Sequence, residues 1–192
     1  MSQELLITIR NRGSIAEITA LLAEEDTEID FQDESGMSPV MEAVLNPDMD
    51  MLELLWAHDP QPTIDLEDER GNTALNHIYL EYDGGDEAML LEILNFLLAR
   101  GANPNHNSET EDTFIEWAAY NGHVNIVSRL LEVQATVGSA IDDARAGILQ
   151  ANNNEERNKY QIIIGLLTAA AQPVDSMSSE VDDEFSARFG AM

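Results

Sequence analysis

Runs of carboxylates are the residues of this chain whose types and spacing could do chemistry. Three such runs, at 24–26, 67–69 and 182–184, could act as acid–base pairs or bind Ca²⁺ through their oxygens. A calcium loop needs acids at alternating positions around a sharp glycine turn. The nearest match, Asp-Gly-Gly-Asp at 83–86, supplies too few oxygens. An acid–base pair needs one carboxyl group in a cleft away from water, which a solvated run does not provide. The carboxylates therefore predict neither a metal site nor a catalytic pair.

Histidine, cysteine and phosphate-binding patterns predict no active site either. The four histidines form no His-x-x-x-His pair that could bind zinc from one helix. They are His58, His77, His106 and His123. The chain has no cysteine, which excludes thiol nucleophiles and thiolate zinc sites, and it has no glycine-rich phosphate loop or Gly-x-Ser-x-Gly turn. We therefore predict a non-catalytic protein that uses no cofactor and no metal.

Net charge is the feature that most restricts the partners. The chain has 37 Asp and Glu against 9 Lys and Arg, a formal charge of −28, and Lys159 is its only lysine. A field of this sign repels the phosphates of nucleic acids and anionic lipids, and it attracts basic protein surfaces. We therefore expect a basic protein partner, with no direct binding to nucleic acid or to a membrane. The alternative is that the acidity maintains solubility or reflects a high-salt habitat.

Composition and the first residues indicate a folded protein of the cytoplasm. Apolar residues make up 44% of the 192 residues, enough for the core of one ordinary domain. Every apolar run is too short to span a membrane. The first ten residues have an acid first and a base last, which is the reverse of a secretory signal, so we expect a cytoplasmic location.

One apolar pattern, an apolar residue followed by two others and then Leu-Leu, recurs five times. The leucine pairs lie at 21–22, 54–55, 97–98, 130–131 and 166–167. Their first members are 33, 43, 33 and 36 residues apart. Positions i, i+3 and i+4 share one face of a helix, so each pattern predicts one apolar stripe. Five stripes at near-constant spacing predict five stacked units.

A pattern of turn and helix cap precedes two of these stripes. Residues 33–41 and 68–76 place Asp, Gly and a hydroxyl at positions shifted by 35. The glycine permits the positive φ of a tight turn. The hydroxyl of Ser38 or Thr73 is placed to cap the next helix, and Pro39 occupies the favoured first helical position. Each unit is therefore predicted to contain a turn, a helix, a short loop and a second helix.

These patterns resemble the ankyrin repeat, whose opening is Asp-x-x-Gly-x-Thr-Pro-Leu-His-x-Ala. Residues 113–131 are similar to the family consensus, with Asn-Gly-His at 121–123 followed by Ile-Val-x-x-Leu-Leu. The resemblance covers about residues 3–170. It implies an all-α ankyrin-repeat solenoid of stacked helix–loop–helix units with inter-repeat hairpin loops, of about five repeats, the last a degenerate C-terminal cap. It also implies that His123 is a loop-bonding residue.

The departures from the consensus locate two irregular parts of the solenoid. The 43-residue step implies an insertion, which we place at 82–86 between the two helices of the third unit. Glu111 stands where a turn glycine is expected. The fifth unit lacks the turn pattern, and its helices are predicted at about 139–151 and 155–171. This is expected of a terminal cap, which shields the last apolar face.

Residues 173–192 form a separate acidic tail by composition, so we predict a repeat domain over 1–172. The tail is polar, and its large apolar residues Val181, Phe185 and Phe189 lie at a spacing of four. Two alternatives remain open for it. It is either disordered, as chain ends commonly are, or a short amphipathic helix docked through these three residues.

The resemblance implies a binding surface made of the inter-repeat loops and the adjoining first helices. The acids expected there are Asp33, Glu34, Glu67, Asp68, Glu69, Glu109, Glu111 and Asp112. The aromatic residues expected to contact a partner are Tyr79, Tyr82, Trp117 and Tyr120. Tyr79 and Tyr82 are three residues apart, as are Trp117 and Tyr120, so the two members of each pair share a helix face. We expect the tyrosines to be better exposed than the tryptophan.

Together these features predict a protein–protein interaction module that binds a basic partner through an acidic concave face. The predicted role is an inhibitor or immunity-type antidote of a basic enzyme, and a host-targeting ankyrin effector is an alternative of the same class. Two alternatives of other classes remain open: a nucleic-acid mimic that occupies a DNA-binding protein, and a scaffold whose acidity serves solubility. We expect the free protein to be a monomer.

Overall fold

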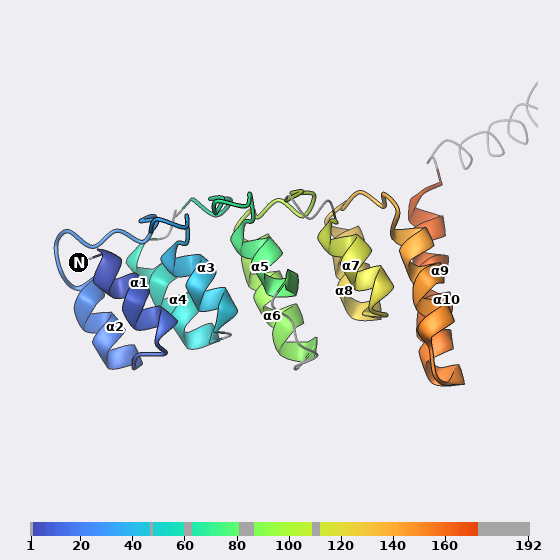
Figure 1. Cartoon of the computed structure of the whole chain (residues 1–192), viewed down its shortest axis with the longest axis horizontal. Helices are drawn as coiled ribbons and strands as arrows, with labels where there is room; N and C mark the ends of the chain where they lie inside the picture. The colour runs from blue at the N-terminus through green and yellow to red at the C-terminus, as the bar shows by residue number, and fades with distance from the viewer. Residues whose placement is uncertain (1, 47, 60–62, 81–86, 109–111, 173–192) are drawn as a thin grey trace, which may run out of the picture.

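The computed structural model describes residues 2–46, 48–59, 63–80, 87–108 and 112–172. Within these ranges the chain forms ten helices in five consecutive pairs and no strand (Figure 1). The pairs are α1 (Ser2–Arg10) with α2 (Ile15–Leu22), α3 (Pro39–Leu45) with α4 (Met49–His58), α5 (Ala74–Leu80) with α6 (Glu87–Leu98), α7 (Phe114–Tyr120) with α8 (Val124–Glu132), and α9 (Ala140–Gln150) with α10 (Asn154–Ala170).

The five pairs stack in one row, as Figure 1 shows. The first helices contact one another in sequence, α1 with α3, α3 with α5, α5 with α7, and α7 with α9. Among the second helices, α2 contacts α4 and α8 contacts α10. The long links between pairs all run along one edge of the row. The predicted all-α solenoid is therefore confirmed.

The five leucine stripes form a continuous core, as predicted. One leucine of each pair is at most 5% exposed, and these are Leu22, Leu55, Leu97, Leu130 and Leu167. The buried leucine is the second of its pair in α2, α4 and α10, and the first in α6 and α8. Successive helix residues differ by about 100° in direction, so the register of each helix against its neighbours decides which leucine faces the core. The pattern in the sequence did not distinguish the two.

Side-chain caps fix where the first helices begin. At α3, Ser38 Oγ accepts the N–H of Met41 at 3.2 Å, as predicted. At α5 the hydroxyl has a different partner, because the backbone N–H and Oγ1 of Thr73 both donate to Asn76 Oδ1 at 2.9 and 2.8 Å. Asn76 is the third residue of α5, the position that a Glu or Gln takes in a capping box. Its side-chain oxygen therefore stabilises the start of the helix in place of a Glu.

A joint between α4 and α6 is formed by one arginine. The guanidinium carbon of Arg100 lies 3.3 Å from the ring centroid of Phe96 and 4.9 Å from that of Trp56. Its Nη1 donates to the Phe96 carbonyl at 2.9 Å, and the two aromatic rings pack edge to face. A flat cation over an aromatic face is attracted by the ring quadrupole, so this cluster holds the second and third pairs together.

The structure describes the helices on either side of the predicted insertion and both helices of the fifth unit. Because α5 ends at Leu80 and α6 begins at Glu87, the predicted insertion at 82–86 falls between the two helices of the third pair, outside the described residues. The two helices of the fifth unit are present as α9 and α10. The tail, 173–192, also lies outside the described residues, and both alternatives for it stay predictions.

Candidate functional site

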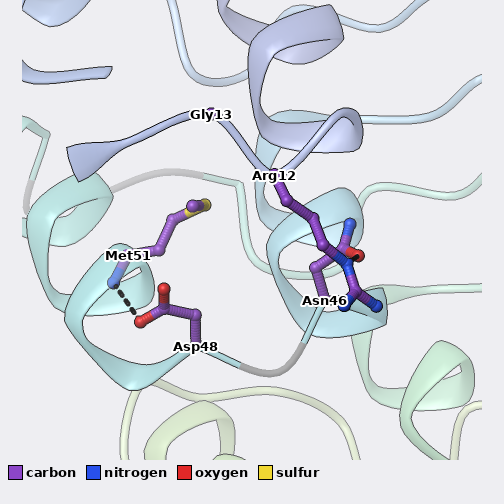
Figure 2. A pocket seen from close by; sticks show the side chains of 5 residues that line it. All are labelled: Arg12, Gly13, Asn46, Asp48 and Met51. Carbon is purple, nitrogen blue, oxygen red and sulfur yellow. Dashed lines mark hydrogen bonds between the residues drawn. The ribbon is translucent and has the colours of Figure 1, made fainter. Parts of the chain in front are cut away.

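A hollow of about 270 Å³ lies on the side of the short turns, between the turn after α1 and the turn after α3 (Figure 2). Arg12 joins these turns, because its Nε donates to Asn46 Oδ1 at 2.8 Å, and Asp48 caps α4 by accepting the N–H of Met51 at 3.2 Å. None of the predicted site residues lines this hollow. The links on the other edge contain the predicted acids.

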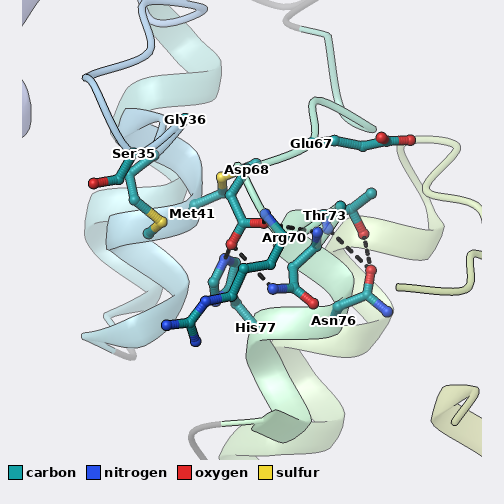
Figure 3. Close-up of polar contacts among 12 residues, drawn as sticks. Ser35, Gly36, Met41, Glu67, Asp68, Arg70, Thr73, Asn76 and His77 are labelled. Carbon is teal, nitrogen blue, oxygen red and sulfur yellow. Dashed lines mark hydrogen bonds and ion pairs between the residues drawn. The ribbon is translucent and has the colours of Figure 1, made fainter. Parts of the chain in front are cut away.

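The link between α4 and α5 is built around Asp68 (Figure 3). Its Oδ1 accepts the N–H groups of Arg70 and Asn72, both at 2.8 Å, and its Oδ2 lies 3.0 Å from Nε2 of His77. The side chain is 7% exposed. Burial raises the pKa of Asp68, but the hydrogen bonds from Asn72 and Arg70 and the charge of His77 outweigh it and hold the pKa below its ordinary value.

The link between α2 and α3 repeats this arrangement at Asp33. Its Oδ1 accepts the N–H groups of Ser35 and Met37 at 2.9 and 3.1 Å, and its Oδ2 accepts Nη2 of Arg10 at 2.7 Å. The same arginine donates to the buried Glu42 at 2.6 Å. Burial raises the pKa of Asp33, and the hydrogen bonds from Arg10 and the two N–H groups outweigh it, so the pKa lies below its ordinary value. The sequence analysis expected Asp33 and Asp68 at the binding surface, and in the structure both carboxylates are bound within their own turns.

The glutamates of the same links lie on the surface. Glu34, Glu67 and Glu69 are exposed, with 58% of the Glu67 side chain accessible. Figure 3 shows Glu67 extending away from the cluster around Asp68. An aspartate carboxylate is close enough to its own backbone to accept turn N–H groups, whereas a glutamate is one methylene longer and extends beyond the turn. In these two turns Asp33 and Asp68 are therefore structural, whereas Glu34, Glu67 and Glu69 are exposed.

Hydrogen bonds between successive links fix the spacing of these acids. A residue of each later link donates its backbone N–H to the link before it. The donors and acceptors are Glu69 with the Ser35 carbonyl (3.0 Å), Asn103 with Asp65 Oδ1 (3.1 Å) and Thr136 with Asn105 Oδ1 (2.7 Å). Sequence reasoning missed these joints. The sequence does contain one indication of them: Asp or Asn recurs in the links about one repeat apart, and two of these side chains are the acceptors.

A groove of about 740 Å³ lies between α3 and α5, below the link that contains Asp68. Its apolar lining includes Met37, Leu45 and Leu80, and its charged lining includes Glu69 and Arg70. The buried part of its lining is polar and includes Glu42, Asp68 and His77, whereas the apolar side chains are the more exposed part. The exposed glutamates and this groove lie on the same part of the solenoid.

Tyr79 is a core residue and not an exposed contact, which corrects the sequence prediction. It is 3% exposed, and its hydroxyl donates to the Asp112 carbonyl at 2.9 Å and accepts Asn76 Nδ2 at 3.0 Å. Its ring centroid lies 5.0 Å from that of Phe114 and 5.7 Å from that of Trp117. Because α5 packs against α7, this face of α5 is covered by the next repeat.

The other predicted aromatic residues differ in exposure. Trp117 is half-buried and stacks on His123, with ring centroids 4.9 Å apart. Tyr120 is 39% exposed, and its hydroxyl accepts a hydrogen bond from Gln150 Nε2. Asp112 is exposed at the start of the fourth pair. Three predicted site residues lie outside the described residues, and they are Tyr82, Glu109 and Glu111.

His123 bonds within the solenoid, between the fourth pair and α6. Its Nδ1 lies 3.5 Å from Glu87 Oε2 at the start of α6. Burial lowers the pKa of His123, and this effect outweighs the opposing attraction of Glu87. Its environment therefore favours the neutral form of the side chain.

Replacing Asp68 with asparagine is expected to lower the melting temperature at pH 7, by a difference that shrinks as the pH falls. The folded pKa of Asp68 lies below its unfolded value of about 3.9. The carboxylate therefore stabilises the fold above about pH 4, and this contribution is lost as the pH falls through the lower folded pKa. Thermal unfolding followed by circular dichroism from pH 7 to pH 3 measures the difference. Glu69→Gln in the same link is the exposed control, and a difference for Asp68→Asn that stays constant to pH 3 would contradict the assignment.

Two other kinds of feature are absent from the described residues. None of their helices is both long enough and apolar enough to cross a membrane. Within the same ranges, no three His, Asp or Glu side chains gather closely enough to hold a metal ion.

Paired helices that stack through shared faces and connect through long links on one edge define a helical repeat solenoid. A family model of ankyrin repeats in three copies matches residues 5–108, more than half of the chain. The chain belongs to the ankyrin-repeat family, and it is a protein–protein interaction module. The last two helix pairs continue the stack beyond the matched residues, and a count of five ankyrin repeats stays a prediction. Comparison with curated proteins finds no match.

Proposed function

We propose that this ankyrin-repeat protein binds a basic protein through its exposed link glutamates and the groove between α3 and α5. The supporting observation is that Glu34, Glu67 and Glu69 are exposed on two links that are hydrogen-bonded to each other. Because these two links are hydrogen-bonded to each other, the backbone that carries the glutamates needs little further ordering when a partner binds. The chain has no catalytic step of its own in this proposal, and its effect is to cover the partner's surface.

The binding mechanism has two steps. The net charge of −28 and the glutamate row attract a basic surface, which raises the rate of encounter. Apolar contact with the groove then slows dissociation, because the affinity of related complexes depends mostly on the dissociation rate. Covering a basic surface in this way suits an inhibitor or an immunity-type antidote of a basic enzyme.

Reversing the charge of Glu34, Glu67 and Glu69 to lysine is expected to lower the association rate by about tenfold at low salt. The partner is first recovered by affinity capture from a lysate of the source organism. Association of the recovered protein is then measured by biolayer interferometry at low and at moderate salt. Raising the salt should slow association of the unaltered chain much more than that of the variant, because salt screens the attraction.

The matched control reverses three exposed acids of the second helices, Glu53, Glu92 and Glu132. It changes the net charge by the same amount at a different part of the surface. The proposal requires that the association rate of the link variant falls more than that of the control variant. Equal losses would indicate that the total charge acts without a defined surface, and recovery of no specific protein would favour the role of the acidity in solubility.

A further inference from the structure

The outer side of the last helix pair has an apolar face. We define the cap face as Ile162, Gly165, Leu166 and Ala169 of α10. Leu149 is 87% and Ile162 is 53% exposed, the two highest values among the large apolar side chains of the described residues. A Cβ added at Gly165 would meet no atom within 4 Å. Large apolar side chains at this exposure indicate an uncovered docking surface.

Helix geometry places these residues away from the stack. The buried residues of α10, Ile163 and Leu167, face α8 and α9, and α9 packs against α7. Ile162, Gly165 and Ala169 follow one another at intervals of three and four, so they share the opposite side of α10. Residues 161–170 contain no charged side chain, in a chain of which 24% is charged. In the part of the chain that the structure describes, no further helix pair follows α10 to cover this side.

Charge is distributed very unevenly between this pair and the rest of the chain. Residues 1–139 contain 28 acidic and five basic residues, whereas 140–172 contain four acidic and three basic ones. The three basic side chains, Arg145, Arg157 and Lys159, are all exposed. An acidic segment is therefore repelled by most of the solenoid and least repelled at the last pair.

We propose that the cap face is covered by the chain's own segment 173–192, docked along α10. This segment has five acidic residues and one basic residue, and its apolar residues Val181, Phe185 and Phe189 fall on one side of a helix. Such a helix spans about 12 Å from the first to the last of them, and the stretch from Ile162 to Ala169 spans about 10 Å. The apolar stripe and the cap face therefore match in length.

The connection allows this docking. The segment begins directly after α10, and residues 171–180 reach at most about 35 Å when extended. A chain that turns back after Ala170 needs much less than this to lie alongside Ile162. Because the segment is tethered, its effective concentration at the cap face is on the order of millimolar.

A second copy of the chain is a poorer occupant of the same face. Two copies each have a formal charge of −28, so their approach is opposed by repulsion between the two solenoids. The tethered segment has a small share of that charge and meets the pair with three exposed cations. Docking of the segment also supplies the shielding that the terminal repeat of a solenoid requires.

Distance measurement between two spin labels tests the proposal. The chain has no cysteine, so Asn152→Cys and Ser186→Cys direct the labels to the turn before α10 and to the segment. Double electron–electron resonance of the full chain is expected to give one short, narrow distance distribution. Phe185→Ser with Phe189→Ser is expected to abolish the narrow component while the far-ultraviolet circular dichroism spectrum shows that the solenoid stays folded.

Gly165→Glu provides the matched test on the other side of the contact. The new side chain enters open space, so the fold is retained, and replacing a helical glycine does not destabilise α10. It places a charge in the cap face and is expected to abolish the narrow component. Asn125→Glu on the exposed surface of α8 adds the same charge elsewhere and should have no effect. A broad distribution in the unaltered chain would overturn the proposal, as would short distances seen only between singly labelled copies mixed together.

Discussion

Replacing Leu130 with alanine is expected to lower the free energy of unfolding by about 2–5 kcal/mol. Leu130 is fully buried in α8, in the fourth of five pairs, so its stripe packs in the interior of the stack. Leu166→Ala in α10 is expected to cost about 1 kcal/mol, because Leu166 is only half-buried in the last helix and less apolar area is lost. In a solenoid each repeat is stabilised by its neighbours, so an interior stripe contributes more than a terminal one.

Urea unfolding followed by far-ultraviolet circular dichroism measures both losses. The comparison is between two leucines with the same chemistry at different places in the row. If Leu166→Ala cost as much as Leu130→Ala, the last pair would contribute as much as an interior pair, and the assignment of α9 and α10 as a cap would be wrong.

Replacing Gly36 with alanine is expected to destabilise the chain more than the same change at Gly71. Both glycines have a left-handed backbone, with φ of +76° and +72°, so alanine costs about 1–2 kcal/mol at either position. At Gly36 the added Cβ would also lie 2.7 Å from Cα of Asp68 and 2.8 Å from the nitrogen of Glu69. At Gly71 it would meet no atom within 4 Å. Separating the two links adds about 1–3 kcal/mol at Gly36.

The two alanine variants share a turn type, so their difference isolates the contact between links. Thermal unfolding of both variants under one buffer condition gives the comparison. Equal losses would show that the links separate without cost, and the hydrogen bond from Glu69 to the Ser35 carbonyl would then contribute little.

The sequence predicted the parts of the fold that depend on the spacing of residues within one helix or one turn. The leucine stripes follow from helical periodicity, and the turn glycines and Ser38 follow from backbone geometry within a few residues. The identity of the buried leucine in each pair was not predictable. It depends on how each second helix is rotated against its neighbours, and nothing within one unit records that rotation.

The candidate site was less predictable, because exposure depends on residues far away in the chain. The sequence around Tyr79 suggested an exposed residue that contacts a partner. In the structure, Phe114 and Trp117 of the next repeat pack against its ring and bury it. Asp68 and Glu69 are neighbours with the same functional group, but only the shorter Asp68 side chain accepts the turn N–H groups, and Glu69 is exposed. The Asp-x-x-Gly spacing was the local indication that this aspartate accepts hydrogen bonds from its own turn.

The exposed Lys159 on α10 has a practical consequence for attaching other molecules to this protein. It is the only lysine, so reagents and conjugating enzymes that act on side-chain amines reach one position, on the last helix pair. A dye, a sensor surface or a ubiquitin-like modifier joined there would orient the solenoid by its C-terminal end. The first two links, with their glutamates, would then lie away from the attached end of the row.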